Sequence, residues 1–490
     1  MIEMASVGRI ARYLKRRTMT KKAFKYAMQR GLGSCVLELQ HTRDIEKYQS
    51  IVLWGCSRDM AYDAQCEGCR SFYLYELITQ FSDKTPFLDV IEKRLFQSMH
   101  STGWEFAQDS ELLAYFALDG NERARKIMEN CYDTLFQILL KKRRRKKYGL
   151  LPERDNFEWL CDDLINICSN DRTLLIELYK KIVKDSGTLI KENELYSFFS
   201  FEQFQSECEE RLGKKTVYRL LYCADADDAI KAYVRSMEDD FNERKAKQAE
   251  WKSIYPESAD EVYELLKNGG KAGQIGQVLP LMYGYNLMIQ NKQKEVVKLA
   301  AYYKNEKEND VRYNLLKLLA NKRCAWALDV ARLIADSKSE NDDFASWAFN
   351  VLSDIRNAKV REYALELLQN GTHRTEALAM LAVNYEETDK DFLINAVKQL
   401  PVTYEDGEWH WVFRAVMDIF SDPVKQKPKE LLRHMYENTL CSSCRVDIVK
   451  EMGRRRMLTK ELLEELQYDC NKHIREYAKK KRSRKAPSPL

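Results

Sequence analysis

The chain has 490 residues, more than one compact core usually holds, so we expect either two to four domains or one long repeat array. Only 18 glycines and 9 prolines occur, which favours helices and argues against a fold of many β-strands. No apolar stretch suits a signal peptide or a transmembrane helix, and the 13 scattered cysteines are typical of reduced thiols, so we expect a cytoplasmic protein of net charge +5 with no membrane partner.

The first half of the chain is expected to be helical but irregular. Apolar periodicity predicts long helices over residues 19–39, 155–184 and 200–222. A further helix over 225–252 ends in a highly charged stretch, which is typical of a solvent-exposed connector rather than a core helix. We therefore expect an N-terminal helical region over 1–255.

A cluster of polar residues lies between Cys56 and Arg70, in an otherwise apolar part of this region. Its side chains either tie down the backbone of a helix–loop–helix corner, which we favour, or form a site for a ligand or partner. No histidine lies nearby in sequence to act as a base, so catalysis is not indicated. The candidate residues are Asp59, Asp63, Gln65, Glu67 and Arg70.

Two cysteine pairs have C-x-x-C spacing, Cys66 with Cys69 and Cys441 with Cys444. Together they could supply the four thiolates of a structural zinc site, and either pair at a helix start could be redox-active. Far more sequence separates the pairs than is usual in structural zinc sites, so we favour incidental thiols packed among helices. We therefore expect no metal and no disulfide.

Three clusters of basic residues contrast with a net acidic remainder. Residues 1–30 hold nine Lys or Arg against one Glu, and residues 471–490 hold eight against one. The third cluster is a run of seven, which is either a solvated helix end or a polyanion contact, because clustered cations are typical of phosphate binding. The candidate polyanion-binding residues are Lys141, Lys142, Arg143, Arg144, Arg145, Lys146 and Lys147.

The second half of the chain repeats about every 33 residues. Val311, Leu315, Leu318 and Leu319 form one apolar stripe on a helix, and related stripes begin near residues 344, 377, 412 and 446. Second amphipathic helices are expected between them, over 324–335, 360–368, 392–400 and 431–435. One helix pair cannot bury its stripe alone and must stack on its neighbours.

Asp310-Val311-Arg312 and Lys359-Val360-Arg361 resemble the short D-V-R signature of the HEAT-like α-helical repeat superfamily. The resemblance covers about 258–482 and implies an all-α fold, an α-solenoid of stacked antiparallel helix pairs. The expected organisation is an irregular helical N-terminal region over 1–255, a repeat array over 256–482 and a basic disordered tail over 483–490.

No residue pattern indicates a reaction. The six histidines form no metal or triad motif, and Gly269–Gly273 lacks the spacing of a phosphate loop, so we expect no catalytic residues and no cofactor and lean against an enzyme. A repeat array suits a non-catalytic scaffold for a macromolecular partner, most simply a protein, with nucleic acid as a further partner through the basic clusters. The oligomeric state is left open.

The alternative function is a DNA glycosylase of the HEAT-like repeat class that acts on alkylated bases. Ile474–Lys479 resembles a terminal helix of that family. Aromatic side chains could stack on a base, although tryptophan is also an ordinary core residue. The tryptophans concerned are Trp326, Trp347, Trp409 and Trp411.

Overall fold

The structure, a computed structural model, is built of α-helices and short 3-10 turns. No β-strand occurs among the residues that it describes, so the all-α class is confirmed. None of the described helices has both the length and the apolar character needed to cross a bilayer. The described residues are 18–101, 104–141, 152–193, 201–223, 226–253, 258–269, 293–320, 325–400, 408–421 and 429–483.

The chain divides into two compact units. Unit 1 comprises residues 1–244, 440–446 and 456–490, and unit 2 comprises 245–439 and 447–455. Helices α14 (Asp228–Ser253) and α26 (Ser442–Arg454) each begin in unit 1 and end in unit 2. This division differs from the expected one near Tyr255, because the last described residues of the chain pack with its first helices.

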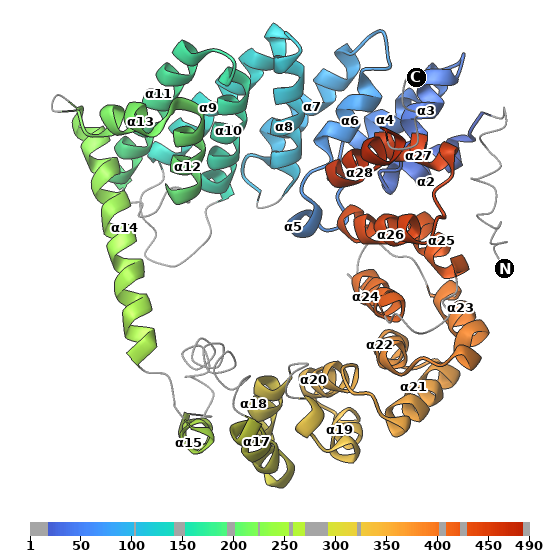
Figure 1. Ribbon diagram of the computed structural model, residues 1–490. Helices are drawn as coiled ribbons and strands as arrows, with labels where there is room; N and C mark the ends of the chain where they lie inside the picture. The colour runs from blue at the N-terminus through green and yellow to red at the C-terminus, as the bar shows by residue number, and fades with distance from the viewer. Residues whose placement is uncertain are drawn as a thin grey trace, which may run out of the picture. The chain divides into compact units, whose positions relative to one another are not determined.

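The N-terminal part of unit 1 is a series of helices in which neighbours along the chain pack on one another (Figure 1). Their apolar faces form the core. In chain order they are α2 (Lys21–Gln29), α3 (Ser34–His41), η2 (Glu46–Tyr48), α4 (Gln49–Cys56), α5 (Ala64–Glu67), α6 (Ser71–Ile78), α7 (Thr85–Ser98), α8 (Trp104–Leu118), α9 (Glu122–Lys141), α10 (Pro152–Cys168), α11 (Arg172–Asn193), α12 (Phe201–Leu212) and α13 (Lys214–Leu221).

The three long helices predicted in this region are each two helices, so those predictions were wrong. Gly31, with φ +67°, lies in the turn between α2 and α3, and Gly213, with φ +85°, separates α12 from α13. Asp171 starts α11, because its carboxylate accepts the backbone N–H groups of Thr173 and Leu174 at 2.9 and 3.1 Å. Apolar periodicity continues across such turns and therefore does not reveal them.

The C-terminal residues complete unit 1 with α27 (Lys460–Glu465), η5 (Leu466–Tyr468) and α28 (Lys472–Ser483). The backbone N–H of Cys470 donates to the carbonyl of Gly31 at 2.9 Å, and η5 packs on α3. A Cβ on Gly31 would collide with the Cys470 side chain. Glycine is therefore required at this position for two reasons, the close contact with Cys470 and the positive φ. Residues 484–490, most of the expected tail, lie outside the described part.

Unit 2 contains the helices predicted over 311–435 in chain order (Figure 1). The last predicted stripe, near residue 446, lies on α26, which begins in unit 1. Neighbours α17 and α18, α19 and α20, and α21 and α22 pack pairwise, while α18, α20, α22 and α24 pack one on the next. This arrangement confirms a helical-repeat fold for unit 2. Its helices are α15 (Ala259–Gly269), α17 (Gln293–Asn305), α18 (Asn309–Leu319), η3 (Ala325–Ala327), α19 (Val330–Asp336), α20 (Asp342–Leu352), α21 (Ala358–Asn370), α22 (Arg374–Asn384), η4 (Glu387–Asp389), α23 (Lys390–Lys398), α24 (Glu408–Ser421) and α25 (Lys429–Asn438).

The residues that indicated the repeat have packing roles. All four members of the α18 stripe are at most 1% exposed. The arginines of these two segments pair with carboxylates further along the chain: Arg312 lies 3.4 Å from Asp336 at the end of α19, and Arg361 lies 2.6 Å from Asp389 in η4, beyond α22. The signature therefore reflects ion pairs that hold nearby helices of the array together, and it indicates no reaction.

We predict that Leu315→Ala destabilises unit 2 by about 2–5 kcal/mol, because Leu315 is fully buried in α18 and the shorter side chain leaves a cavity. The matched control is Leu265→Ala, since Leu265 is 43% exposed and should cost no more than about 0.5 kcal/mol. Urea unfolding, with hydrogen exchange of the α18 and α20 amides, measures both. Equal effects of the two substitutions would contradict this assignment of the core.

Candidate functional site

The polar corner predicted from the sequence, residues 57–70, links α4 to α6 through the single turn of α5. The Asp63 side chain caps α5 by accepting the N–H of Cys66 at 3.3 Å. Gly68 then reverses the chain with φ +71°, which a residue with a side chain rarely adopts. The Asp63 cap and the Gly68 turn therefore place Asp63 and Cys66 on one short turn, and Cys69 follows on the other side of Gly68.

The first half of the corner is held by hydrogen bonds to its backbone. The Asp59 carboxylate accepts the N–H of Ala61 at 2.9 Å. The side chain of Gln108, fully buried on α8, accepts the N–H of Met60 at 3.0 Å and donates to the carbonyl of Arg58 at 2.6 Å. These contacts fit the structural interpretation of the cluster, because buried backbone groups must be hydrogen-bonded.

Glu67 and Arg70 form an ion pair at 3.0 Å whose side chains are 0% and 2% exposed. Glu67 also accepts the N–H of Ser442 at 2.7 Å, and Arg70 donates to the carbonyls of Gln29 at 2.5 Å and Leu440 at 2.6 Å. Burial alone would raise the pKa of Glu67, but the Arg70 charge and the hydrogen bonds from Ser442 and Asp63 outweigh it and lower that pKa. The pair thus joins the corner to the segment before α26.

A second buried ion pair lies next to the first. Arg445 Nε and Nη2 contact the two carboxylate oxygens of Asp469 at 2.9 and 3.0 Å, and both side chains are fully buried. Arg445 Nη2 also approaches the carbonyl of Gly31 at 3.5 Å. Arg445 and Asp469 were not predicted from the sequence, because nothing in the neighbouring residues distinguishes them from ordinary surface charges.

The candidate residues of the corner therefore separate into two groups. Asp59, Glu67 and Arg70 are committed to internal hydrogen bonds and are unavailable to a ligand. Gln65 and Cys66 are exposed, and Asp63 beside them is half-buried. The part of the corner that can meet a ligand is thus the α5 turn.

Of the predicted polyanion-binding run, Lys141 is an exposed residue at the end of α9. The other six residues lie outside the described part of the chain. On α28, the basic residues Lys472, Lys479, Lys480 and Arg482 are also exposed, so this helix presents positive charge along its solvent face.

Unit 2 carries a groove of about 280 Å³ between α24 and the end of α26. Phe413 and Met417 provide an apolar surface, and Arg414 and Asp418 lie on the same helix. The lining residues from α26 are Asp447, Lys450 and Arg454. Positions three, four or seven residues apart share one helical face, so both helices present charged residues of both signs along the groove.

We predict that Glu67→Gln destabilises unit 1 by about 3 kcal/mol, because it breaks a buried ion pair and leaves the Arg70 charge without its counterion. The matched control is Asp133→Asn, which removes the exposed ion pair with Lys181 and should cost less than about 1 kcal/mol. Urea unfolding with hydrogen exchange of α3 and α6 amides reports both.

This pair also has a pH signature. Because the pKa of folded Glu67 lies below its ordinary value of about 4.3, the pair contributes fully above that pH and its contribution is lost as the pH falls through the lowered pKa. Glu67→Gln should therefore flatten the acid limb of the stability profile. A variant with an unchanged acid limb would contradict the ion-pair assignment.

Comparison with known proteins identifies no family for this chain. No family model matches it, and no curated protein matches it. Among solved structures, SYS-1 matches with 12% identity over 95% of this chain and 96% of that chain, at a TM-score of 0.23. A chain from a study of the interaction between cadherin and beta-catenin matches with 12% identity over 98% and 100%, at a TM-score of 0.19. TM-scores this low establish neither a shared partner nor a shared activity.

Proposed function

We propose that this protein is a helical-repeat scaffold that binds a protein partner through the groove between α24 and α26. The main support for this proposal is the composition of the groove: the apolar side chains of Phe413 and Met417 are bordered by charged residues of both signs. At about 280 Å³ it lies just below the usual range of small-molecule pockets, about 300–1,000 Å³, and it suits one or two side chains of a larger partner.

Trp411 extends this surface along α24. It is 51% exposed and lies three and seven residues before Arg414 and Asp418, on the same helical face. Exposed tryptophan and arginine are the residues that most often dominate the binding energy of a protein interface. The partner that fits is a segment with an apolar anchor flanked by acidic and basic residues.

The glycosylase alternative is not favoured. Ile474 and Ala478, which belong to the resembling segment, are 1% and 0% exposed core residues of α28 in unit 1. Trp409 is likewise buried, at 3% exposure. Ordinary helix packing therefore accounts for these residues without a base-binding role.

We predict that Trp411→Ala weakens capture of the partner by roughly 10–30-fold, the loss expected at an interface centre, while leaving the fold intact because the side chain is half exposed. The measurement is quantitative mass spectrometry of proteins retained from a native lysate by the wild-type chain and by the variant. Affinity of each retained protein for both forms is then measured with purified components.

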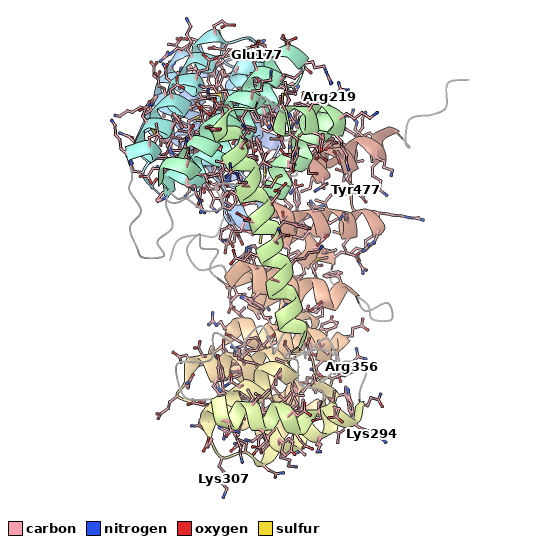
Figure 2. All side chains as sticks on the ribbon, turned by 90° about the vertical axis from the view of Figure 1, so that its left-hand side faces the viewer. Glu177, Arg219, Lys294, Lys307, Arg356 and Tyr477 are labelled. Atoms are coloured by element: carbon pink, nitrogen blue, oxygen red, sulfur yellow. The ribbon has the colours of Figure 1, made fainter. Side chains whose placement is uncertain are left out.

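The matched control is Lys294→Glu, which alters an exposed residue of unit 2 whose side chain projects from its helix (Figure 2). A protein retained equally by the wild type and the control but lost with Trp411→Ala supports the proposal. Retention of the same proteins by all three forms, or of none by any, would overturn it.

A second candidate function is polyanion binding, which the exposed basic residues of α28 and the run that begins at Lys141 favour. We predict that single- or double-stranded DNA or RNA binds with an affinity that falls steeply with salt, by a log–log slope of about −0.7 to −0.9 per phosphate contacted. Titrations at two salt concentrations measure the slope.

The test variant changes Arg143, Arg144 and Arg145 to Glu. The charge-matched control changes Lys294, Lys307 and Arg356 to Glu, three exposed residues of unit 2 (Figure 2). Loss of binding in the first variant alone supports this function. Binding that is absent at low salt, or that both triple variants weaken equally, leaves the protein scaffold as the proposed function.

A further inference from the structure

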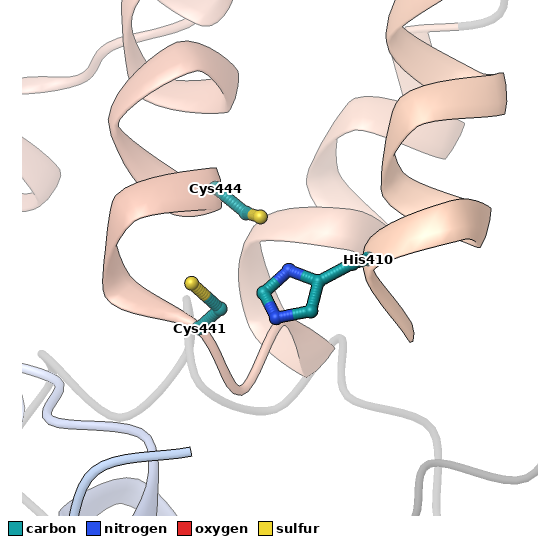
Figure 3. A group of neighbouring side chains, drawn as sticks. All are labelled: His410, Cys441 and Cys444. Atoms are coloured by element: carbon teal, nitrogen blue, oxygen red, sulfur yellow. The ribbon is translucent and has the colours of Figure 1, made fainter. Parts of the chain in front are cut away.

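Two cysteines lie together at the start of α26. Cys441 immediately precedes the helix and is 1% exposed, while Cys444 lies on its first turn and is partly exposed. Both thiols are free, and their sulfur atoms lie within 4.8 Å of each other (Figure 3). Both residues belong to unit 1, so the pair forms within a single compact unit.

In the other C-x-x-C motif of the chain, each thiol has an acceptor of its own. The Cys66 thiol donates to the Asp63 carboxylate, and this hydrogen bond, with burial, raises the pKa of Cys66 to about 11. The Cys69 thiol donates to the carbonyl of Trp104 at 3.9 Å, on the other side of the Gly68 turn. The two motifs therefore have the same spacing and different thiol environments.

Cys441 is the sulfur of its pair that the fold stabilises as a thiolate. Hydrogen bonds from the Cys444 thiol and from the backbone N–H groups of Cys444 and Ser443 lower the pKa of Cys441, although burial opposes them. The same thiol-to-sulfur hydrogen bond, together with burial, raises the pKa of Cys444. The two sulfur atoms therefore share one proton, and the start of the helix favours the negative charge that results.

Buried contacts fix the backbone on both sides of the pair. Arg70 donates to the carbonyl of Leu440 at 2.6 Å, just before Cys441. Arg445, just after Cys444, is fully buried in its ion pair. A backbone held in this way keeps the two sulfur atoms close, so their effective concentration exceeds that in an unfolded chain and disulfide formation is favoured.

We propose that Cys441 and Cys444 form a reversible dithiol–disulfide centre that hydrogen peroxide oxidises. Cys444, the more exposed sulfur, passes its proton to Cys441 and attacks one peroxide oxygen. The O–O bond breaks, and the departing hydroxide takes that proton from Cys441 to become water. The Cys441 thiolate then attacks the sulfenic sulfur of Cys444, so that the S–S bond forms and the S–O bond breaks.

The hydroxide released in this second step takes a proton from solvent. Two electrons thus pass from the sulfur atoms to peroxide, which becomes two water molecules, and a small dithiol reverses the oxidation by exchange. Peroxide is little larger than water, which suits a pair that is mostly buried. This inference goes beyond the proposed function, whose groove lies in unit 2.

The test uses the full chain, reduced, freed of reductant without oxygen and treated with an equimolar amount of hydrogen peroxide. Samples taken over time are alkylated and digested with trypsin, which places both cysteines of each motif on one peptide, residues 434–445 and residues 59–70. Mass spectrometry then measures the fraction of each peptide that has lost two hydrogen atoms and gained no alkyl group. Peptide 59–70 is the matched control, because its cysteines have the same spacing.

In the folded chain the disulfide should form in peptide 434–445 roughly 10-fold faster than in peptide 59–70, and roughly 10-fold faster than in the same peptide of the urea-unfolded chain. Dithiothreitol should restore the free thiols. These comparisons need no substitution, so they hold even if a variant fails to fold.

Two variants assign the roles of the sulfur atoms. Cys441→Ser should leave Cys444 as a sulfenic acid that dimedone traps, because no second thiol attacks it. Cys69→Ser, in the other motif, should leave the oxidation rate of peptide 434–445 unchanged.

Three outcomes would overturn the proposal. They are equal rates of disulfide formation in the two peptides of the folded chain, a rate in peptide 434–445 that unfolding does not lower, or conversion of Cys444 to a sulfinic acid with no disulfide. The last outcome would show that Cys441 does not reach the oxidised sulfur.

Discussion

Unit 1 depends on two adjacent buried ion pairs, Glu67 with Arg70 and Arg445 with Asp469. Each arginine also reaches backbone carbonyls, and those carbonyls belong to both ends of the chain. Buried charges that lack partners are costly, so these guanidinium groups fix the segments that surround them in one arrangement. The backbone hydrogen bond from the N–H of Cys470 to the carbonyl of Gly31 joins the same segments.

The contact between the α5 turn and the start of α26 follows from the same interactions. The Glu67 carboxylate accepts the N–H of Ser442, and Arg70 donates to the carbonyl of Leu440, so these two residues bring the segment around Cys441 against the α5 turn. The polar residues of the corner thus act in the structural way that we favoured from the sequence. Their effect is nonetheless to bring the Cys66 turn against the start of α26, where the Ser443 hydroxyl donates to the carbonyl of Cys66.

Unit 2 is organised on a different principle. Its helices bury apolar stripes against the next pair in sequence, and Arg312 and Arg361 reinforce local neighbours rather than distant ones. Such an array gains stability from nearest-neighbour contacts and leaves exposed surface along every pair. The groove with Trp411 is one such surface, and its mixture of apolar and charged groups is the basis of the proposed protein partner.

The sequence by itself determined the helical class, the 33-residue repeat and the positions of the paired helices in unit 2, because each depends on local periodicity that Val311, Leu315, Leu318 and Leu319 make visible. Only the tertiary structure decided the rest. Turns at Gly31 and Gly213 end helices although the apolar pattern of the sequence continues across them. A positive φ does not alter that pattern, so periodicity alone does not locate these turns. The segment that contains Cys441, Arg445 and Asp469 packs against the first helices of the chain. Such contacts join residues 370 or more positions apart, so they depend on how the whole of unit 1 packs and not on local sequence.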